Sequence, residues 1–220
     1  MNSLTFKQQQ SGFSLIEMAI VLVIVGLLIA GLMLPMTAQL DQKNYNATQK
    51  ELSDLRDALV GYALSHTALD GRPFLPCPDS SGDGFENRDA AGNCVMVQGA
   101  LPWVTLGLGQ SDSWGRQYIY RVSNVFANSN IGFSLASLGD NQVRETVGGN
   151  LLASNVPAVI VSKGKGGLGL GLDEQENSNG NVTFISRLPS DVGANAFDDL
   201  VIWLPATVLF NRMVTAGKLP

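Results

Sequence analysis

The sequence has 220 residues, of which 45% are hydrophobic and only 15% are charged, and its formal net charge is −5. Soluble proteins average about 25% charged residues, so this chain either buries a large core or places apolar residues in lipid. Binding nucleic acid needs a basic face, and the acidic balance with scattered Lys and Arg argues against one. Two cysteines and one histidine are too few for a zinc site.

The first predicted element is a membrane-spanning helix. Residues 18–34 form a run of 17 apolar residues without a charge. A spanning helix needs about 20 residues. The apolar core of a secretory signal has only about 7–15 residues and precedes its cleavage site, whereas here a small polar leader comes first and the apolar run follows without a break. Lys7 and the initiator amine are the positive charges before the span, and they favour a cytoplasmic N-terminus. Everything after residue 40 would then lie outside.

Glu17 is the unusual residue of this segment, because it is the only charged residue between Phe13 and Met36. A carboxylate inside a spanning helix costs about 2.5–3.5 kcal/mol or more, and such residues are usually functional. No Lys or Arg lies between Phe13 and Gln42 to pair with it along its own helix. In a simple anchor, Glu17 would merely sit at the membrane interface.

The residues around Glu17 give the chain a family resemblance. The stretch Ser11-Gly12-Phe13-Ser14-Leu15-Ile16-Glu17 resembles the type IV prepilin signature, which has Gly, then an aromatic or apolar residue, then Glu four residues later and an apolar helix. The resemblance implies that prepilin peptidase cuts between Gly12 and Phe13 on the cytoplasmic side and methylates the Phe13 amine. In the filament core, Glu17 of one subunit would pair with the Phe13 amine of its neighbour.

The same resemblance implies partners and a location. The partners are prepilin peptidase, other pilins or pseudopilins and an assembly platform in the bacterial inner membrane. The chain would cross that membrane once with its C-terminal domain in the periplasm, and would then enter a pilus or pseudopilus.

This interpretation divides the chain into a leader peptide (residues 1–12), a transmembrane and filament-core helix (13–38), an amphipathic continuation of that helix (39–66) and a periplasmic globular domain (67–220). The continuation is indicated by apolar residues that recur at helical spacing. They are Leu52, Leu55, Leu59 and Tyr62.

Two features lie in the turn-rich stretch that follows. Cys77 and Cys94 would form one disulfide in an oxidising compartment, closing loop 77–94, and would be buried free thiols in a cytosolic domain. The loop also offers hard oxygen ligands at alternating positions of a Gly-containing turn, an arrangement that suits calcium. They are Asp79, Ser81, Asp83 and Glu86. The alternative is a solvated acidic turn without an ion.

The rest of the chain predicts strands and a closing helix. Alternating or apolar runs indicate strands at residues 118–126, 132–138, 157–162, 182–186 and 200–204. Residues 206–216 read as a helix, with Pro205 at its start and Gly217 just past its end. The predicted fold class is α+β and pilin-like: a long N-terminal helix packed on an antiparallel sheet, with a short C-terminal helix.

Three later segments, at residues 112–120, 134–140 and 197–203, resemble the major pseudopilin of type II secretion. Major pseudopilins hold calcium with the corresponding loop, which implies a second candidate set of ligands. They are the Leu138 carbonyl, Asp140, Asp198 and Asp199. The chain lacks the usual residue between Gly139 and Asp140, and residues 209–220 have no counterpart there. These differences favour a minor or accessory subunit.

The sequence therefore predicts a filament subunit and not an enzyme. The pair Ser162 and Lys165 spells S-x-x-K, but it ends a strand and has no K-T-G companion. No cofactor is required, and calcium is the one ion for which the sequence offers ligands. The alternative function is a membrane-anchored periplasmic binding or adhesion module that never polymerises.

Overall fold

The computed structural model describes residues 12–220, apart from the side chains of residues 31–36 and 194. The chain divides into two compact units, Met1–Lys43 and Asn44–Pro220. Residues 1–11 of the predicted leader lie outside the described residues.

The first unit contains the beginning of helix α1 (Leu15–Ser65), whose described apolar side chains from Leu15 to Ile29 are exposed. Among the helices of the described residues, none is long and apolar enough to cross a membrane. The predicted span 13–38 includes residues 31–36, whose side chains lie outside the described part, and its placement in a membrane remains a prediction.

The second unit is built on two sheets. The larger sheet has four antiparallel strands in the order β1-β2-β5-β7: β1 (Gln98–Ala100), β2 (Ile119–Val122), β5 (Ala158–Ser162) and β7 (Leu200–Leu204). The smaller sheet has the order β4-β3-β6: β4 (Leu151–Val156), β3 (Asn141–Arg144) and β6 (Thr183–Ile185). In it β3 pairs with β4 antiparallel and with β6 parallel. The second sheet was not predicted from the sequence.

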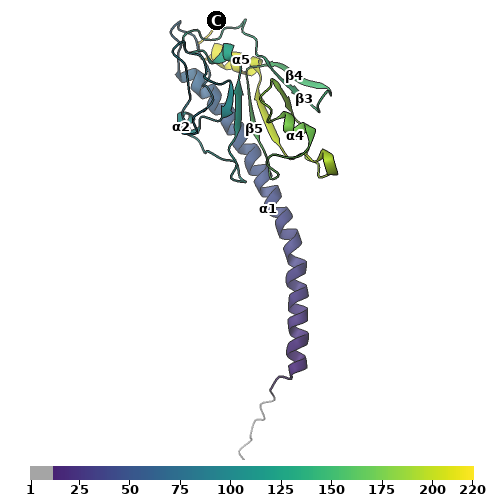
Figure 1. The fold of residues 1–220 in the computed structure, drawn as a ribbon. Helices are drawn as coiled ribbons and strands as arrows, with labels where there is room; N and C mark the ends of the chain where they lie inside the picture. Colours follow the sequence, from purple (N-terminus) through teal and green to yellow (C-terminus); the bar gives the residue numbers. More distant parts are fainter. Residues whose placement is uncertain (1–11) are drawn as a thin grey trace, which may run out of the picture. The chain divides into compact units, whose positions relative to one another are not determined.

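Strand β5 lies in the interior of the second unit (Figure 1), and its side chains are buried on both faces, which explains how the layers stack. Ala158 and Ile160 join one core cluster with the last turns of α1 and with α5 (Ala206–Thr215). Val159 and Val161 join a second cluster, formed with the β3-β4-β6 sheet. The larger sheet therefore lies between helices on one face and the smaller sheet on the other, which is why β5 reads as a continuous apolar run.

The amphipathic part of α1 packs as its spacing predicts. The helix buries one side chain every three or four residues against the larger sheet. The buried set includes Leu52, Leu55 and Leu59 in the main cluster, and Tyr62 beside it. The α+β fold, with a long N-terminal helix, an antiparallel sheet and a short C-terminal helix, is confirmed.

Two predicted strands are wrong in whole or in part. Residues 132–138 form no strand, because Phe133 is buried in the core, and the Ser137 hydroxyl accepts a hydrogen bond from the Ser134 N–H at 3.0 Å to make a local turn. The strand predicted at 118–126 ends at Val122, and a short helix α3 (Asn124–Ala127) follows Ser123. Local side-chain hydrogen bonding outweighed the alternating pattern in the first segment.

The described connections also hold short helices, α2 (Trp103–Leu106), α4 (Leu172–Glu176) and a 3-10 turn at Gly193–Asn195. Helix α4 follows a glycine-rich run at residues 164–171. In the structure this run lies against the residues that precede β7. A Cβ on Gly164 would come within 2.2 Å of the Asp198 carbonyl oxygen, so close packing accounts for the glycine there.

Candidate functional site

The predicted processing motif lies at the start of α1. Gly12, Phe13 and Ser14 are not helical, and the helix begins at Leu15. Phe13 is 84% exposed. A Cβ added at Gly12 would meet nothing within 4 Å, so the fold of the described chain does not require glycine at this position. The predicted cleavage bond therefore sits in an accessible, non-helical stretch.

Glu17 is engaged with its own helix terminus. Its Oε2 accepts a hydrogen bond from the Ser14 N–H at 2.8 Å, and the Ser14 hydroxyl oxygen accepts one from the Glu17 N–H at 3.3 Å. This reciprocal pair is a capping box, which satisfies two of the amide groups that a helix start leaves unpaired. In the single chain, the carboxylate thus has a local role that a new partner would have to displace.

The disulfide between Cys77 and Cys94 is present in the structure, as predicted. Arg88 reinforces the same loop from inside. Its guanidinium donates to the Leu75 carbonyl at 3.0 Å and to the Gly92 carbonyl at 3.2 Å, and pairs with Glu86 at 2.7 Å. The loop is therefore held both covalently and by a partly buried ion pair.

The first predicted calcium set is only partly brought together. The Asp79 carboxylate accepts backbone N–H groups from Ser81, Gly82 and Gly84 at 2.7–2.9 Å. Burial raises the pKa of Asp79, but these N–H groups outweigh burial and lower the pKa below its usual value. The Ser81 hydroxyl bonds both Asp79 and Asp83.

Glu86, the fourth residue of that set, is turned elsewhere. Its carboxylate accepts hydrogen bonds from the Cys77 N–H at 2.9 Å and the Tyr62 hydroxyl at 2.8 Å, in addition to its pairing with Arg88. Asp79 and its neighbours therefore form an acidic turn that is stabilised by backbone N–H groups, and Glu86 is not part of it; whether calcium binds there stays a prediction.

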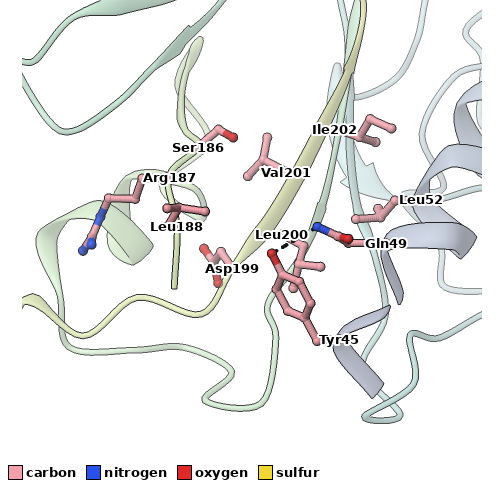
Figure 2. A pocket seen from close by; sticks show the side chains of 10 residues that line it. All are labelled: Tyr45, Gln49, Leu52, Ser186, Arg187, Leu188, Asp199, Leu200, Val201 and Ile202. Carbon is pink, nitrogen blue, oxygen red and sulfur yellow. Dashed lines mark hydrogen bonds between the residues drawn. The ribbon is translucent and has the colours of Figure 1, made fainter. Parts of the chain in front are cut away.

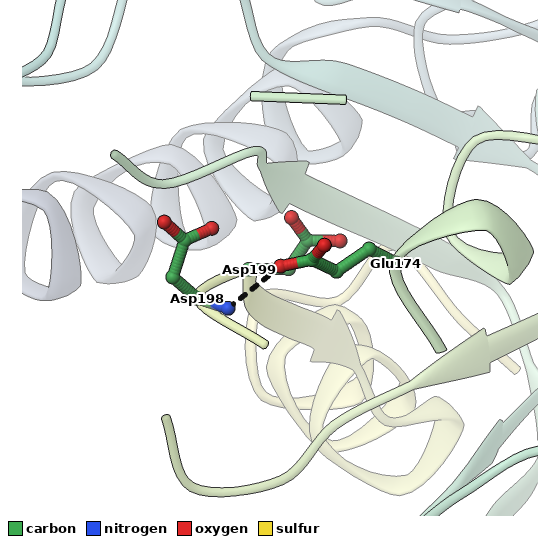
Figure 3. A group of neighbouring side chains, drawn as sticks. All are labelled: Glu174, Asp198 and Asp199. Carbon is green, nitrogen blue, oxygen red and sulfur yellow. Dashed lines mark hydrogen bonds between the residues drawn. The ribbon is translucent and has the colours of Figure 1, made fainter. Parts of the chain in front are cut away.

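The second predicted set is also brought together only in part: Asp198 and Asp199 lie close to each other, but Asp140 does not belong to their group. Asp140 pairs with the buried Arg121 at 3.1 Å and accepts a hydrogen bond from the Ser123 hydroxyl. Among the described residues, the acidic group whose oxygens lie within 4.8 Å of one another joins Asp198 and Asp199 with Glu174, a residue the sequence analysis did not select. Glu174 comes from α4, and the two aspartates directly precede β7 (Figure 3).

This carboxylate cluster, Glu174 with Asp198 and Asp199, is largely removed from solvent. Glu174 is 5% and Asp199 4% exposed. The Asp198 N–H donates to Glu174 Oε1 at 3.0 Å, and the Asn177 side-chain amide donates to Asp199 Oδ2 at 2.9 Å. Asp198 Oδ1 and Asp199 Oδ1 are buried without a hydrogen-bond partner. Such unpaired buried acceptors are rare and need an explanation.

The electrostatics of the cluster are unfavourable to three ionised groups. Burial raises the pKa of all three carboxyls, and for Asp199 the charges of Glu174 and Asp198 add to burial and raise the pKa to about 7, with Lys163 acting in the opposite direction. The arrangement favours either proton uptake or a bound cation. The glycine-rich run before Glu174 is the feature of the sequence that could have pointed to this residue. Its Gly169 leaves the space that the Glu174 carboxylate occupies, because a Cβ on Gly169 would fall 1.2 Å from Glu174 Oε2.

A separate cavity of about 510 Å³ lies beside β7, the last strand of its sheet (Figure 2). One wall is formed by α1, where the Gln49 amide donates to the Tyr45 hydroxyl at 3.1 Å. The other walls come from residues 186–188 and 199–202. The cavity is lined by both apolar and polar side chains, and it runs along the edge strand β7.

A comparison with protein families finds a match in the N-terminal segment. Residues 7–33 match the prokaryotic N-terminal methylation motif. This motif is the prepilin signature of type IV pilins and pseudopilins. No curated protein and no solved structure matches the chain.

Proposed function

We propose that this chain is a pilin-like minor subunit of a type IV pilus or of a type II secretion pseudopilus. The observation that carries the proposal is the methylation motif at residues 7–33, set on a helix whose described apolar side chains from Leu15 to Ile29 are exposed. Contiguous exposed apolar surface of this size needs lipid or protein to cover it. An inner membrane would cover it before assembly, and neighbouring subunits would cover it afterwards.

The processing step creates the charge that assembly needs. Hydrolysis of the Gly12–Phe13 bond by prepilin peptidase would release the leader and leave a free amine on Phe13, which is then methylated. The amine is a cation located four residues before Glu17. In an apolar filament core, an unpaired carboxylate is costly, and a cation from the adjacent subunit offsets that cost.

The capping box suggests how this exchange proceeds. Before assembly, Glu17 accepts the Ser14 N–H and stabilises the first turn of α1. On docking, a charged amine is a stronger partner than a backbone amide, because it adds the attraction between two opposite full charges, which is large in an apolar surrounding. Glu17 would therefore turn from its own helix to the incoming Phe13 amine and set the register between subunits.

The test is assembly of the Glu17→Val variant, expressed with the wild-type machinery. We expect it to enter the membrane and be cleaved normally, and to be depleted from sheared filaments relative to the membrane fraction. Glu17→Asp keeps the charge with a shorter reach, and should be intermediate.

Ser14→Ala is the matched control, because it removes one capping contact worth about 1 kcal/mol while leaving the carboxylate in place. It should assemble at nearly the wild-type level. If Ser14→Ala fails as badly as Glu17→Val, helix capping rather than intersubunit pairing is what matters. If Glu17→Val enters filaments normally, the better interpretation is an anchored binding or adhesion module that does not polymerise.

A further inference from the structure

We propose that the free edge of β7 is a docking site for an extended peptide segment of a partner protein. The segment would add to the larger sheet as a further antiparallel strand and would place a lysine or arginine side chain at Asp199. In this mode of recognition, main-chain hydrogen bonds give affinity and side-chain pockets give specificity. The inference concerns the second unit alone, and does not depend on whether the chain polymerises.

The two edges of the larger sheet differ. On the outer side of β1, the Asp79 N–H donates to the Ala100 carbonyl at 2.9 Å and the Ala100 N–H donates to the Asp79 carbonyl at 3.0 Å, so that edge is covered. In the described part of the chain, β7 pairs with β5 and with no other strand. Its register with β5 has no shift, and Leu200–Leu204 contains no charge or proline. Bulges, charges and prolines are the usual means of protecting an edge, so this one is bare.

The ladder shows which backbone groups of β7 face outward. The Ser123 N–H donates to the Pro157 carbonyl at 2.8 Å, so residue 157 directs its carbonyl towards β2. The backbone groups of successive residues alternate between the two sides of a strand, so Ile160 directs its groups towards β7, where it pairs with Ile202. The N–H and C=O groups of Ile202 therefore face β5, and those of Val201 face away from the sheet.

The cavity of about 510 Å³ runs along this bare edge (Figure 2). Four consecutive residues, 199–202, line it. Consecutive side chains of a strand point to opposite faces, so a cavity lined by an unbroken run borders the edge of the sheet and not one face. The other walls are the stretch 186–188 and one face of α1, with Tyr45, Gln49 and Leu52 at helical spacing. The cavity therefore follows the line that an added strand would take.

The polar groups of the cavity favour a cationic side chain. Asp199 is 4% exposed, and its Oδ1 has no hydrogen-bond partner among the described residues. Arg187 also lines the cavity, but its guanidinium donates to Asp173 and to the Asn195 carbonyl, both at 2.8 Å. The lining therefore carries an unsatisfied acceptor at the start of β7, and a lysine or arginine of the added strand would satisfy it. In an antiparallel addition, that residue stands near the C-terminal end of the peptide.

The test uses the full chain in detergent and fluorescently labelled peptides with blocked ends. The reference peptide is Thr-Val-Thr-Val-Thr-Lys, and fluorescence anisotropy should show saturable binding. An analogue with every backbone amide N-methylated cannot donate to the ladder, and one with norleucine in place of lysine cannot pair with Asp199. Each analogue should bind at least about tenfold more weakly. Absence of binding by the reference peptide at about 1 mM, or equal binding by the N-methylated analogue, would overturn the proposal.

Two variants of the chain locate the peptide. Asp199→Asn should remove the preference for lysine over norleucine, whereas the matched control Asp191→Asn, an exposed residue outside the cavity, should keep it. Val201→Pro removes an N–H that the sheet does not use, so the domain should stay folded by circular dichroism and lose peptide binding. If Val201→Pro unfolds, the N-methylated analogue still decides whether the backbone ladder is needed.

Two further outcomes would count against the proposal. A lysine preference that persists in Asp199→Asn would show that the peptide binds elsewhere. A wild-type dimer that Val201→Pro lacks, together with absence of peptide binding, would show that a second copy of the chain covers the edge.

Discussion

Removing the disulfide tests how the loop 77–94 is stabilised. The double variant Cys77→Ala/Cys94→Ala opens a loop whose ends are 17 residues apart. In the chain-entropy model, closing a loop of this size stabilises the folded state by about 3 kcal/mol. For a chain of this length, the loss corresponds to a fall in melting temperature of about 6–12 °C.

Other contacts of the loop and the core should remain in this double variant. Arg88 continues to bind the Leu75 and Gly92 carbonyls, and Cys77 lies at 0% exposure inside the main core cluster. The domain should therefore stay folded at 25 °C with a lower melting temperature, and the loop should become the first site of protease cleavage.

The assay is thermal unfolding followed by circular dichroism, with reduced wild-type protein as the matched control. Reduction should reproduce most of the fall, because it opens the same loop without changing side-chain volume. A fall of less than about 2 °C would refute the reasoning, and would mean that the Arg88 contacts alone order the loop. A domain that is unfolded at 25 °C would also refute the reasoning, because it would mean that the disulfide contributes much more than about 3 kcal/mol.

Two further predictions concern the two ends of α1. Gly12→Val should block cleavage without disturbing the described fold, since nothing lies within 4 Å of the position of a Cβ; mass spectrometry should find the leader retained, and normal processing would contradict the prepilin interpretation. Leu59→Ala should lower the free energy of unfolding by about 2–5 kcal/mol in a urea titration, because Leu59 is 1% exposed in the core. Asp57 is exposed on the same helix, so Asp57→Ala should change the free energy of unfolding by no more than about 0.5 kcal/mol. Equal effects of the two variants would contradict the packing of α1 on the sheet.

The regular elements with strong local patterns were predictable. The spacing of Leu52, Leu55 and Leu59 gave the buried stripe of α1, and strands β5 and β7 begin and end within one residue of their predicted bounds. The smaller sheet was harder, because residues 141–144 and 151–156 lack a clear alternation. These strands are buried because they pack on the second apolar face of β5, and no pattern within their own residues indicates that contact.

The sequence by itself determined the processing motif, because Gly12, Phe13 and Glu17 stand at fixed positions within six consecutive residues and the motif is defined by that spacing alone. Only the tertiary structure decided the carboxylate cluster. Glu174 and Asp198 are 24 residues apart, and the reversal between them depends on how α4 and β7 pack. The direction of each carboxylate was likewise set by its neighbours, since Arg121 draws Asp140 away while Asn177 holds Asp199 in the cluster. Hydrogen bonds and ion pairs between distant segments form only when packing brings the groups within about 3 Å, and sequence spacing carries no record of that distance.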